Sequence, residues 1–126
     1  MKIIVTGANG YIGMHVVKDL INAKHEVIAL DLNFNNISNL KCKKVKCDIF
    51  KTEKLIDIVG IPDVLIHLAW RDGFNLNSYN HILDVSSHFR FIKNFIDCGL
   101  KHIALLGSMH EIGFYEGEVD DDVILN

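Results

Sequence analysis

The sequence predicts a single α/β domain with a parallel sheet of about five strands and helices on both faces of the sheet. Short apolar runs alternate with amphipathic stretches at regular intervals, which is typical of strands that are connected by helices. The first apolar run leads directly into a glycine-rich turn, as in many parallel sheets that bind a ligand. The 126 residues have the length of one domain.

The predicted elements alternate along the chain after a first strand from Lys2 to Thr6. A helix from Tyr11 to Ala23 follows the glycine turn, and residues 33–40 form a loop with at most one short helical turn. The other predicted strands are 25–31, 43–47, 63–68 and 102–106, and the other predicted helices are 51–59 and 78–98. Short right-handed crossovers give these strands the order 3-2-1-4-5.

The long helix carries a stripe of apolar residues at three- and four-residue steps, and we expect this stripe to face the core. Its members are Ile82, Val85, Phe89, Ile92 and Ile96. Gly99 is placed to end the helix, because glycine accepts the left-handed backbone of a helix cap.

Composition limits the possible functions. A net charge of −3 argues against nucleic acid as a partner. The four lysines within residues 41–46 are expected to protect an edge strand from pairing with another strand, or to solvate a loop. The three cysteines form no C-x-x-C pair, and no His/Cys spacing indicates a metal site. No apolar run has the roughly 18 residues of a membrane helix, and there is no leader pattern, so we expect a cytoplasmic protein.

The glycine turn and an acidic residue after it indicate a dinucleotide site. The turn reads Thr6-Gly7-Ala8-Asn9-Gly10-Tyr11-Ile12-Gly13 and lies between a strand and a helix N-terminus, where backbone N–H groups attract a pyrophosphate. Asp31 ends the second predicted strand and can accept hydrogen bonds from an adenosine ribose, although a solvated strand end is the alternative. No Lys or Arg occurs from Leu32 to Ile37, which favours NAD over NADP.

Together these motifs resemble the extended short-chain dehydrogenase/reductases, in particular the NAD-dependent sugar-nucleotide epimerases and dehydratases. The turn resembles their T-G-x-x-G-x-x-G motif, and Cys47-Asp48-Ile49 is similar to their G-D-hydrophobic segment. His67-Leu68-Ala69-Trp70 resembles their H-x-A-A/G motif. The resemblance implies a Rossmann-like three-layer α/β/α domain over residues 1–112. It also implies that the turn holds pyrophosphate, that Asp31 contacts ribose, that Leu32 also binds the cofactor, that Asp48 and Ile49 contact adenine, and that Leu68, Ala69 and Trp70 line the cofactor.

Two positions have more than one interpretation. His67 is either a satisfied core histidine or part of a strand end whose backbone contacts the cofactor, and we assign it no proton transfer. Ser108 falls on the family's catalytic Ser/Thr position in a partial match, Gly107-Ser108-Met109-His110-Glu111-Ile112-Gly113. By the resemblance, its hydroxyl would bind the reacting oxygen of the substrate; a serine that only caps or turns the chain at a strand end is the alternative.

The family's catalytic Tyr-x-x-x-Lys pair is not found in the sequence. Tyr11, Tyr79 and Tyr115 are followed four positions later by His15, Leu83 and Val119. We therefore expect an NAD-binding portion without its substrate domain, inactive alone, whose full-length form acts on a nucleotide sugar. A non-catalytic NAD-binding module, acting as a sensor or partner subunit, is the alternative. Residues 113–126 form an acidic tail, predicted to be a loop or partly disordered. The uncovered fifth strand would be covered either in a homodimer, which we expect, or by this tail folding over it.

Overall fold

The computed structural model describes residues 1–52, 54–75, 77–107 and 116–119. Within them, five parallel strands form one sheet in the order β3-β2-β1-β4-β5, which confirms the predicted fold class and strand order. The strands are β1 (Lys2–Thr6), β2 (Glu26–Asp31), β3 (Lys43–Lys46), β4 (Val64–His67) and β5 (His102–Leu105). The helices are α1 (Tyr11–Asn22), α2 (Leu55–Val59) and α3 (Asn80–Asp97), with a 3₁₀ turn η1 (Asn35–Ile37).

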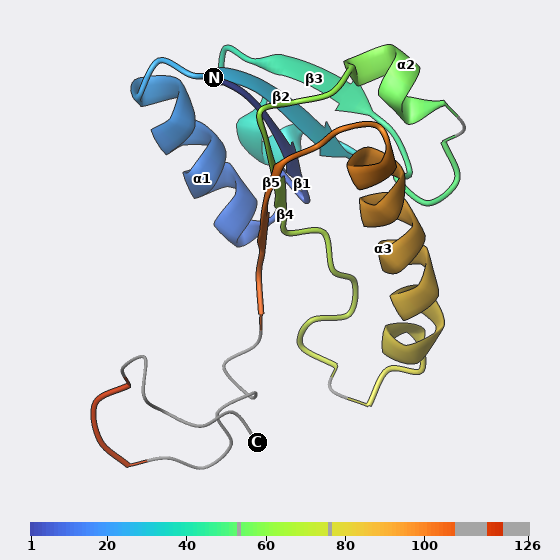
Figure 1. Ribbon diagram of the computed structural model, residues 1–126. Helices are drawn as coiled ribbons and strands as arrows, with labels where there is room; N and C mark the ends of the chain where they lie inside the picture. Colours follow the sequence, from blue (N-terminus) through green and yellow to red (C-terminus); the bar gives the residue numbers. More distant parts are fainter. Residues whose placement is uncertain (53, 76, 108–115, 120–126) are drawn as a thin grey trace.

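The elements form three layers, with α1 on one face of the sheet and α2 and α3 on the other (Figure 1). Alternate residues of the central strands supply the two cores, because successive side chains of a strand point to opposite faces. On the α1 side, Ile3 and Val5 pack with Val17. On the other side, Ile4 packs with Leu55 of α2 and with Phe95 of α3, among others. This arrangement brings the carboxyl ends of β1, β2 and β4 together along one side of the sheet, at the ends of the strands. We call this side the carboxyl edge; ligands bind there in open α/β sheets.

Helix α2 begins later than expected, at Leu55 and not at Lys51. The carbonyl of Asp48 accepts hydrogen bonds from the N–H groups of Lys51 and Thr52, which closes a separate turn before the helix. Lys54 then takes a left-handed backbone with φ of 55°, so continuous helical geometry starts only after it. The pattern of apolar residues contains no signal for this left-handed residue.

The prediction that the apolar stripe of α3 faces the core is wrong for four of its five members. Ile82, Val85, Phe89 and Ile96 are 50–71% exposed, and only Ile92 packs against the core. The helix buries Asp84, Phe91 and Phe95 instead. These three lie seven and four positions apart and so share a face of the helix. Because Asp84 is polar, this face does not show a regular apolar periodicity in the sequence.

The sheet edges are those expected from the strand order. β3 is one edge, and Lys44 on it donates from Nζ to the carbonyl oxygens of Ser38 and Leu40. β5 is the other edge, and all four of its residues are exposed. None of the helices in the described part of the chain is long and apolar enough to cross a bilayer.

Candidate functional site

The glycine turn between β1 and α1 has a shape that only glycine permits at two positions. A methyl group on Gly13 would lie 2.1 Å from the carbonyl oxygen of Gly7, far inside van der Waals contact. Gly7 has φ of +66°, and a methyl group there would lie 2.8 Å from the backbone nitrogen of Ala69. The turn therefore packs against the start of its own helix and against the end of β4, which leaves a cradle made of backbone.

The first residues of α1 supply hydrogen-bond donors to this cradle. Gly10 N–H donates to Gly7 O at 3.1 Å, and Met14 N–H donates to Gly10 O at 2.9 Å. Between them, Tyr11, Ile12 and Gly13 have no carbonyl one turn earlier as a partner among the hydrogen bonds of the described residues. Such N–H groups at a helix N-terminus attract phosphate oxygens, and the helix dipole adds to this attraction.

Asp31 lies at the end of β2 beside the turn, and its carboxylate is held in place by the backbone. Its Oδ2 accepts the N–H of Asn9 at 2.9 Å, and its Oδ1 accepts the N–H of Leu32 at 2.7 Å. A carboxylate oxygen has two acceptor positions, so each oxygen keeps one for a ligand hydroxyl. The alternative of a merely solvated strand end does not describe this residue, because its carboxylate links β2 to the turn.

Two asparagines in the segment that the sequence predicts to be a loop also belong to this arrangement. Asn9 donates from Nδ2 to Oδ1 of Asn33 at 2.6 Å, and its Oδ1 accepts the N–H of Asn36 at 2.8 Å. Asn36 donates in return from Nδ2 to the carbonyl of Asn9 at 2.8 Å. These bonds hold the segment after β2 against the glycine turn. The sequence shows an asparagine-rich segment here, but it does not show that the segment bonds to Asn9. Asn9 lies 24 residues before Asn33 and 27 residues before Asn36.

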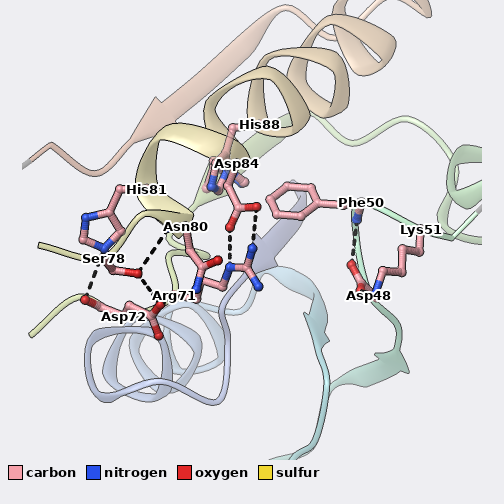
Figure 2. A network of polar contacts seen from close by, with 11 residues as sticks. Asp48, Phe50, Lys51, Arg71, Asp72, Ser78, Asn80, His81, Asp84 and His88 are labelled. Carbon is pink, nitrogen blue, oxygen red and sulfur yellow. Dashed lines mark hydrogen bonds and ion pairs between the residues drawn. The ribbon is translucent and has the colours of Figure 1, made fainter. Parts of the chain in front are cut away.

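Asp48 and Ile49, the pair expected at an adenine, follow β3. Asp48 Oδ1 accepts the N–H of Phe50 at 3.0 Å, and Oδ2 lies 3.4 Å from Lys51 Nζ. Figure 2 shows Phe50 and Lys51 beside Asp48. Ile49 lines a cleft of about 510 Å³ between α2 and α3, together with Leu55 and Phe91. The residues that line this cleft do not include the glycine turn or Asp31, so it is a separate hollow beside the site.

The end of β4 is joined to β1 through the hydroxyl of Thr6. The N–H groups of Leu68 and Ala69 both donate to Thr6 Oγ1 at 3.2 Å, and Thr6 Oγ1 lies 2.8 Å from His67 Nδ1. His67 is 8% exposed, and its Nε2 lies 2.8 Å from Nδ1 of His88 on α3. The structure therefore makes His67 a buried and hydrogen-bonded histidine. Burial, with His88 beside it, lowers the pKa of His67 to about 4.

Trp70 stands where the H-x-A-A/G motif has a small residue. It is half exposed, and its indole stacks on the ring of His88 with centroids 5.1 Å apart and planes at 22°. Because the ring packs on α3, the indole lies over the histidine and extends the aromatic surface at the end of β4.

An ion pair that the sequence did not reveal ties the segment after β4 to α3. Arg71 donates from Nε and Nη2 to the two carboxylate oxygens of Asp84, at 2.5 and 2.8 Å (Figure 2). Next to it, Asp72 accepts hydrogen bonds from Ser78 and Asn80, which lower the pKa of its carboxyl group. These contacts tie Arg71 and Asp72, in the segment after β4, to the start of α3.

The predicted site residues fall into three groups. The glycine turn, Asp31 and Ala69 come together at the carboxyl edge of the sheet, with Leu68 and Trp70 adjacent in the chain to Ala69. Asp48 and Ile49 lie on the neighbouring strand end, and no hydrogen bond of the described residues joins them to the turn. Ser108 lies outside the described residues, as do most residues of the acidic tail.

Fold and turn together define a Rossmann-type α/β domain with a backbone cradle at the carboxyl edge of its sheet. The family model described as "NAD dependent epimerase/dehydratase family" matches residues 3–122. The chain belongs to this family.

Individual relatives agree with this assignment. The dTDP-6-deoxy-L-talose 4-dehydrogenase (NAD(+)) of Aggregatibacter actinomycetemcomitans is 38% identical over 130 residues, which cover 100% of this chain and 48% of that protein. Among solved structures, MoeE5 in complex with UDP-glucuronic acid and NAD has a TM-score of 0.82 at 22% identity, covering 100% of this chain and 43% of that chain. UDP-glucuronic acid 4-epimerase from Bacillus cereus in complex with NAD has a TM-score of 0.75 at 23% identity, covering 100% and 46%. The chain thus spans about half the length of the relatives it matches.

Proposed function

We propose that the chain is the NAD-binding portion of an NAD-dependent enzyme that acts on a nucleotide sugar. The observation that carries this proposal is the backbone cradle, in which Gly7 and Gly13 leave room that any side chain would fill. The N–H groups of Tyr11 and Ile12 would bind the pyrophosphate, with Ala8, Asn9 and Gly10 completing the turn. Relatives whose names include NAD and UDP or dTDP sugars support the choice of cofactor and substrate class.

The rest of the cofactor would lie along the carboxyl edge of the sheet. Asp31 would accept hydrogen bonds from the adenosine ribose, and Asp48 and Ile49 would contact the adenine. Leu68, Ala69 and Trp70 would line the path toward the nicotinamide. When bound, NAD supplies the hydride acceptor, while the residues of this chain bind and orient it.

We also propose that the 126-residue chain does not complete a reaction by itself, and that it acts in the cytoplasm. The family resemblance calls for a Tyr-x-x-x-Lys pair, and none of the chain's three tyrosines has a lysine four positions later. Ser108 would be the one catalytic-motif residue within this portion, binding the reacting oxygen of the substrate. The three cysteines are free, which is the usual state of thiols in a reducing compartment.

Calorimetric titration with NAD and NADP tests the binding proposal. We expect NAD to bind and NADP to bind at least about tenfold more weakly, because its 2′-phosphate would lie against the carboxylate of Asp31. Asp31→Ala should weaken NAD binding and remove the preference, whereas Asp19→Ala, the same change at an exposed position of α1, should leave both unchanged. No binding of NAD by a chain with a native circular dichroism spectrum would contradict the proposal.

We further propose that two copies pair through the exposed face of α3. Ile82, Val85, Phe89, Ile92 and Ile96 follow strict alternating steps of three and four residues, the spacing of a seam between two helices. Four of the five are at least half exposed, so the seam is open to a partner.

Sedimentation velocity over a range of protein concentrations tests this pairing. We expect a dimer that Phe89→Glu converts to a monomer, because a buried unpaired carboxylate is costly in an apolar interface. Phe74→Glu, the same change at a fully exposed loop position, should leave the dimer intact. A wild-type chain that stays monomeric at every concentration would rule out the α3 interface.

A further inference from the structure

We propose that His88 is a positioning residue for the cofactor site, which it reaches through a directed chain of hydrogen bonds from Thr6 to His67 to His88. The chain of bonds requires His88 to be neutral, so NAD affinity should fall when His88 is protonated. This inference rests on the proposed function, because it concerns the same site. It assigns a role to a helix residue that does not itself line the cradle.

The direction of the first bond follows from the burial of Thr6. Its side chain is fully buried, so its hydroxyl proton needs an acceptor inside the protein. Two of the groups around Thr6 Oγ1 are the N–H donors of Leu68 and Ala69, and the third is His67 Nδ1. The hydroxyl therefore donates to Nδ1, and His67 is the neutral tautomer with its proton on Nε2.

The second bond then has only one possible direction. His67 Nε2 carries the proton and lies 2.8 Å from Nδ1 of His88, so His67 donates and His88 accepts. His88 must also be the neutral Nε2–H tautomer, because its Nδ1 is used as an acceptor. Each link thus fixes the tautomer of the next, from the end of β1 through β4 to α3.

This chain of bonds ends at the wall of the cradle. Thr6 Oγ1 accepts a hydrogen bond from the N–H of Ala69, and Gly7 packs against the backbone nitrogen of Ala69. Losing the bond between His67 and His88 would free His67 to turn away from Thr6 and would loosen the contact between the ends of β1 and β4. The shape of the cradle depends on this contact between the two strand ends, because the backbone of Gly7 packs directly against the backbone of Ala69.

A proton on His88 would break the chain of bonds at its second link. The added proton would go to Nδ1, where it would face the N–H of His67. Of the groups around His88, Asp84 on α3 favours the cation, but both of its oxygens are held by Arg71. From the segment after β3, the ring of Phe50 makes a T-shaped contact with His88, and Asp48 and Lys51, on either side of Phe50 in this segment, form an ion pair. From the segment after β4, the indole of Trp70 stacks on the ring of His88.

The expected pH range follows from the direction of the pKa shifts. Burial lowers the pKa of His88, against the opposing effect of Asp84, and His67 is lowered to about 4. A lowered pKa means that the folded state favours the neutral ring, so at a pH of about 6.5, the ordinary pKa of a histidine, the ring of His88 is mostly neutral and the chain of bonds is intact. The chain of bonds is lost as the pH falls through the pKa of His88 in the folded protein, which lies below that value.

Calorimetric titration with NAD at pH 7.5 and below pH 6 tests the role of His88. We expect wild-type affinity to fall about tenfold between the two conditions, an effect of about 1.4 kcal/mol. His88→Asn should bind NAD at pH 7.5 and lose the pH dependence, because its Oδ1 can accept the bond from His67 but takes up no proton. His88→Phe keeps a ring beside Trp70 without an acceptor and should bind about tenfold more weakly at both pH values, while His102→Asn, on the exposed edge strand, should behave as wild type.

Two measurements that need no cofactor separate this inference from the proposed function. Nitrogen-15 spectra of the histidine rings at pH 7.5 should show His67 and His88 as Nε2–H tautomers. Trp70 is the only tryptophan of the chain, and its fluorescence should be quenched when the stacked ring of His88 becomes charged. That transition should lie below pH 6.5, disappear in His88→Asn, and persist in His81→Asn, although His81 also contacts Trp70.

The outcomes are distinct. If the wild-type chain binds no NAD but shows both tautomers and the fluorescence transition, the cofactor proposal fails and the chain of hydrogen bonds stands. An Nδ1–H tautomer at either histidine, or an unchanged pH dependence of NAD binding in His88→Asn, would overturn the inference about His88.

Discussion

The substitution Gly13→Ala is expected to lower NAD affinity at least about 100-fold, which is about 2.7 kcal/mol of binding free energy. The added methyl group would lie 2.1 Å from Gly7 O and 2.9 Å from Ala8 Cα, both backbone atoms that cannot rotate away. The start of α1 would have to move from the turn, and the N–H groups of Tyr11 and Ile12 would move with it. Overpacking of this kind also lowers stability by about 1–3 kcal/mol.

Titration calorimetry of folded Gly13→Ala protein checks this expectation, with circular dichroism to establish that the fold is kept. Gly73→Ala is the matched control, because a methyl group at Gly73 would meet its nearest atom, in the ring of Trp70, at 3.9 Å. It should bind NAD with wild-type affinity. Wild-type affinity in Gly13→Ala would mean that the turn does not hold the pyrophosphate.

The substitution Phe95→Ala is expected to lower the free energy of unfolding by about 3–5 kcal/mol, the usual cost of removing a buried phenylalanine ring. Phe95 is 1% exposed and packs in the core between the sheet and α3, with Phe91 as its neighbour. A loss of this size is a large part of the stability of a single domain. Urea unfolding followed by circular dichroism measures it, and the slope of the transition should stay unchanged.

Phe89→Ala is the control on the same helix, measured at dilutions where the chain is monomeric. Phe89 is 64% exposed, so its truncation should change the free energy of unfolding by less than about 1 kcal/mol. Equal losses for the two phenylalanines would mean that the stripe with Phe89 is buried after all, as the sequence pattern had suggested.

Some residues of the candidate site could be predicted from the sequence, whereas most of the side-chain contacts around them could not. Gly7, Gly13 and Asp31 were predictable. The glycines belong to a turn that is local in the sequence, and Asp31 is the last residue of the strand that comes next. The partners of Asn9 in the asparagine-rich segment were not, since a side-chain contact across more than twenty residues leaves no periodic pattern. The bonds of His67 to Thr6 and His88 were missed for the same reason, although each residue stood in a recognisable element.

The strand order, the glycine cradle and the family can all be predicted from the amino-acid sequence alone, because the alternation of strands and helices and the chemistry of the turn are properties of neighbouring residues. The tertiary structure decided which face of α3 is buried. Large aromatic rings and the ion pair between Asp84 and Arg71 direct that face to the sheet and leave the more regular apolar stripe exposed. It also decided that Thr6, His67 and His88 form one chain of hydrogen bonds, because only packing brings β1, β4 and α3 within bonding distance.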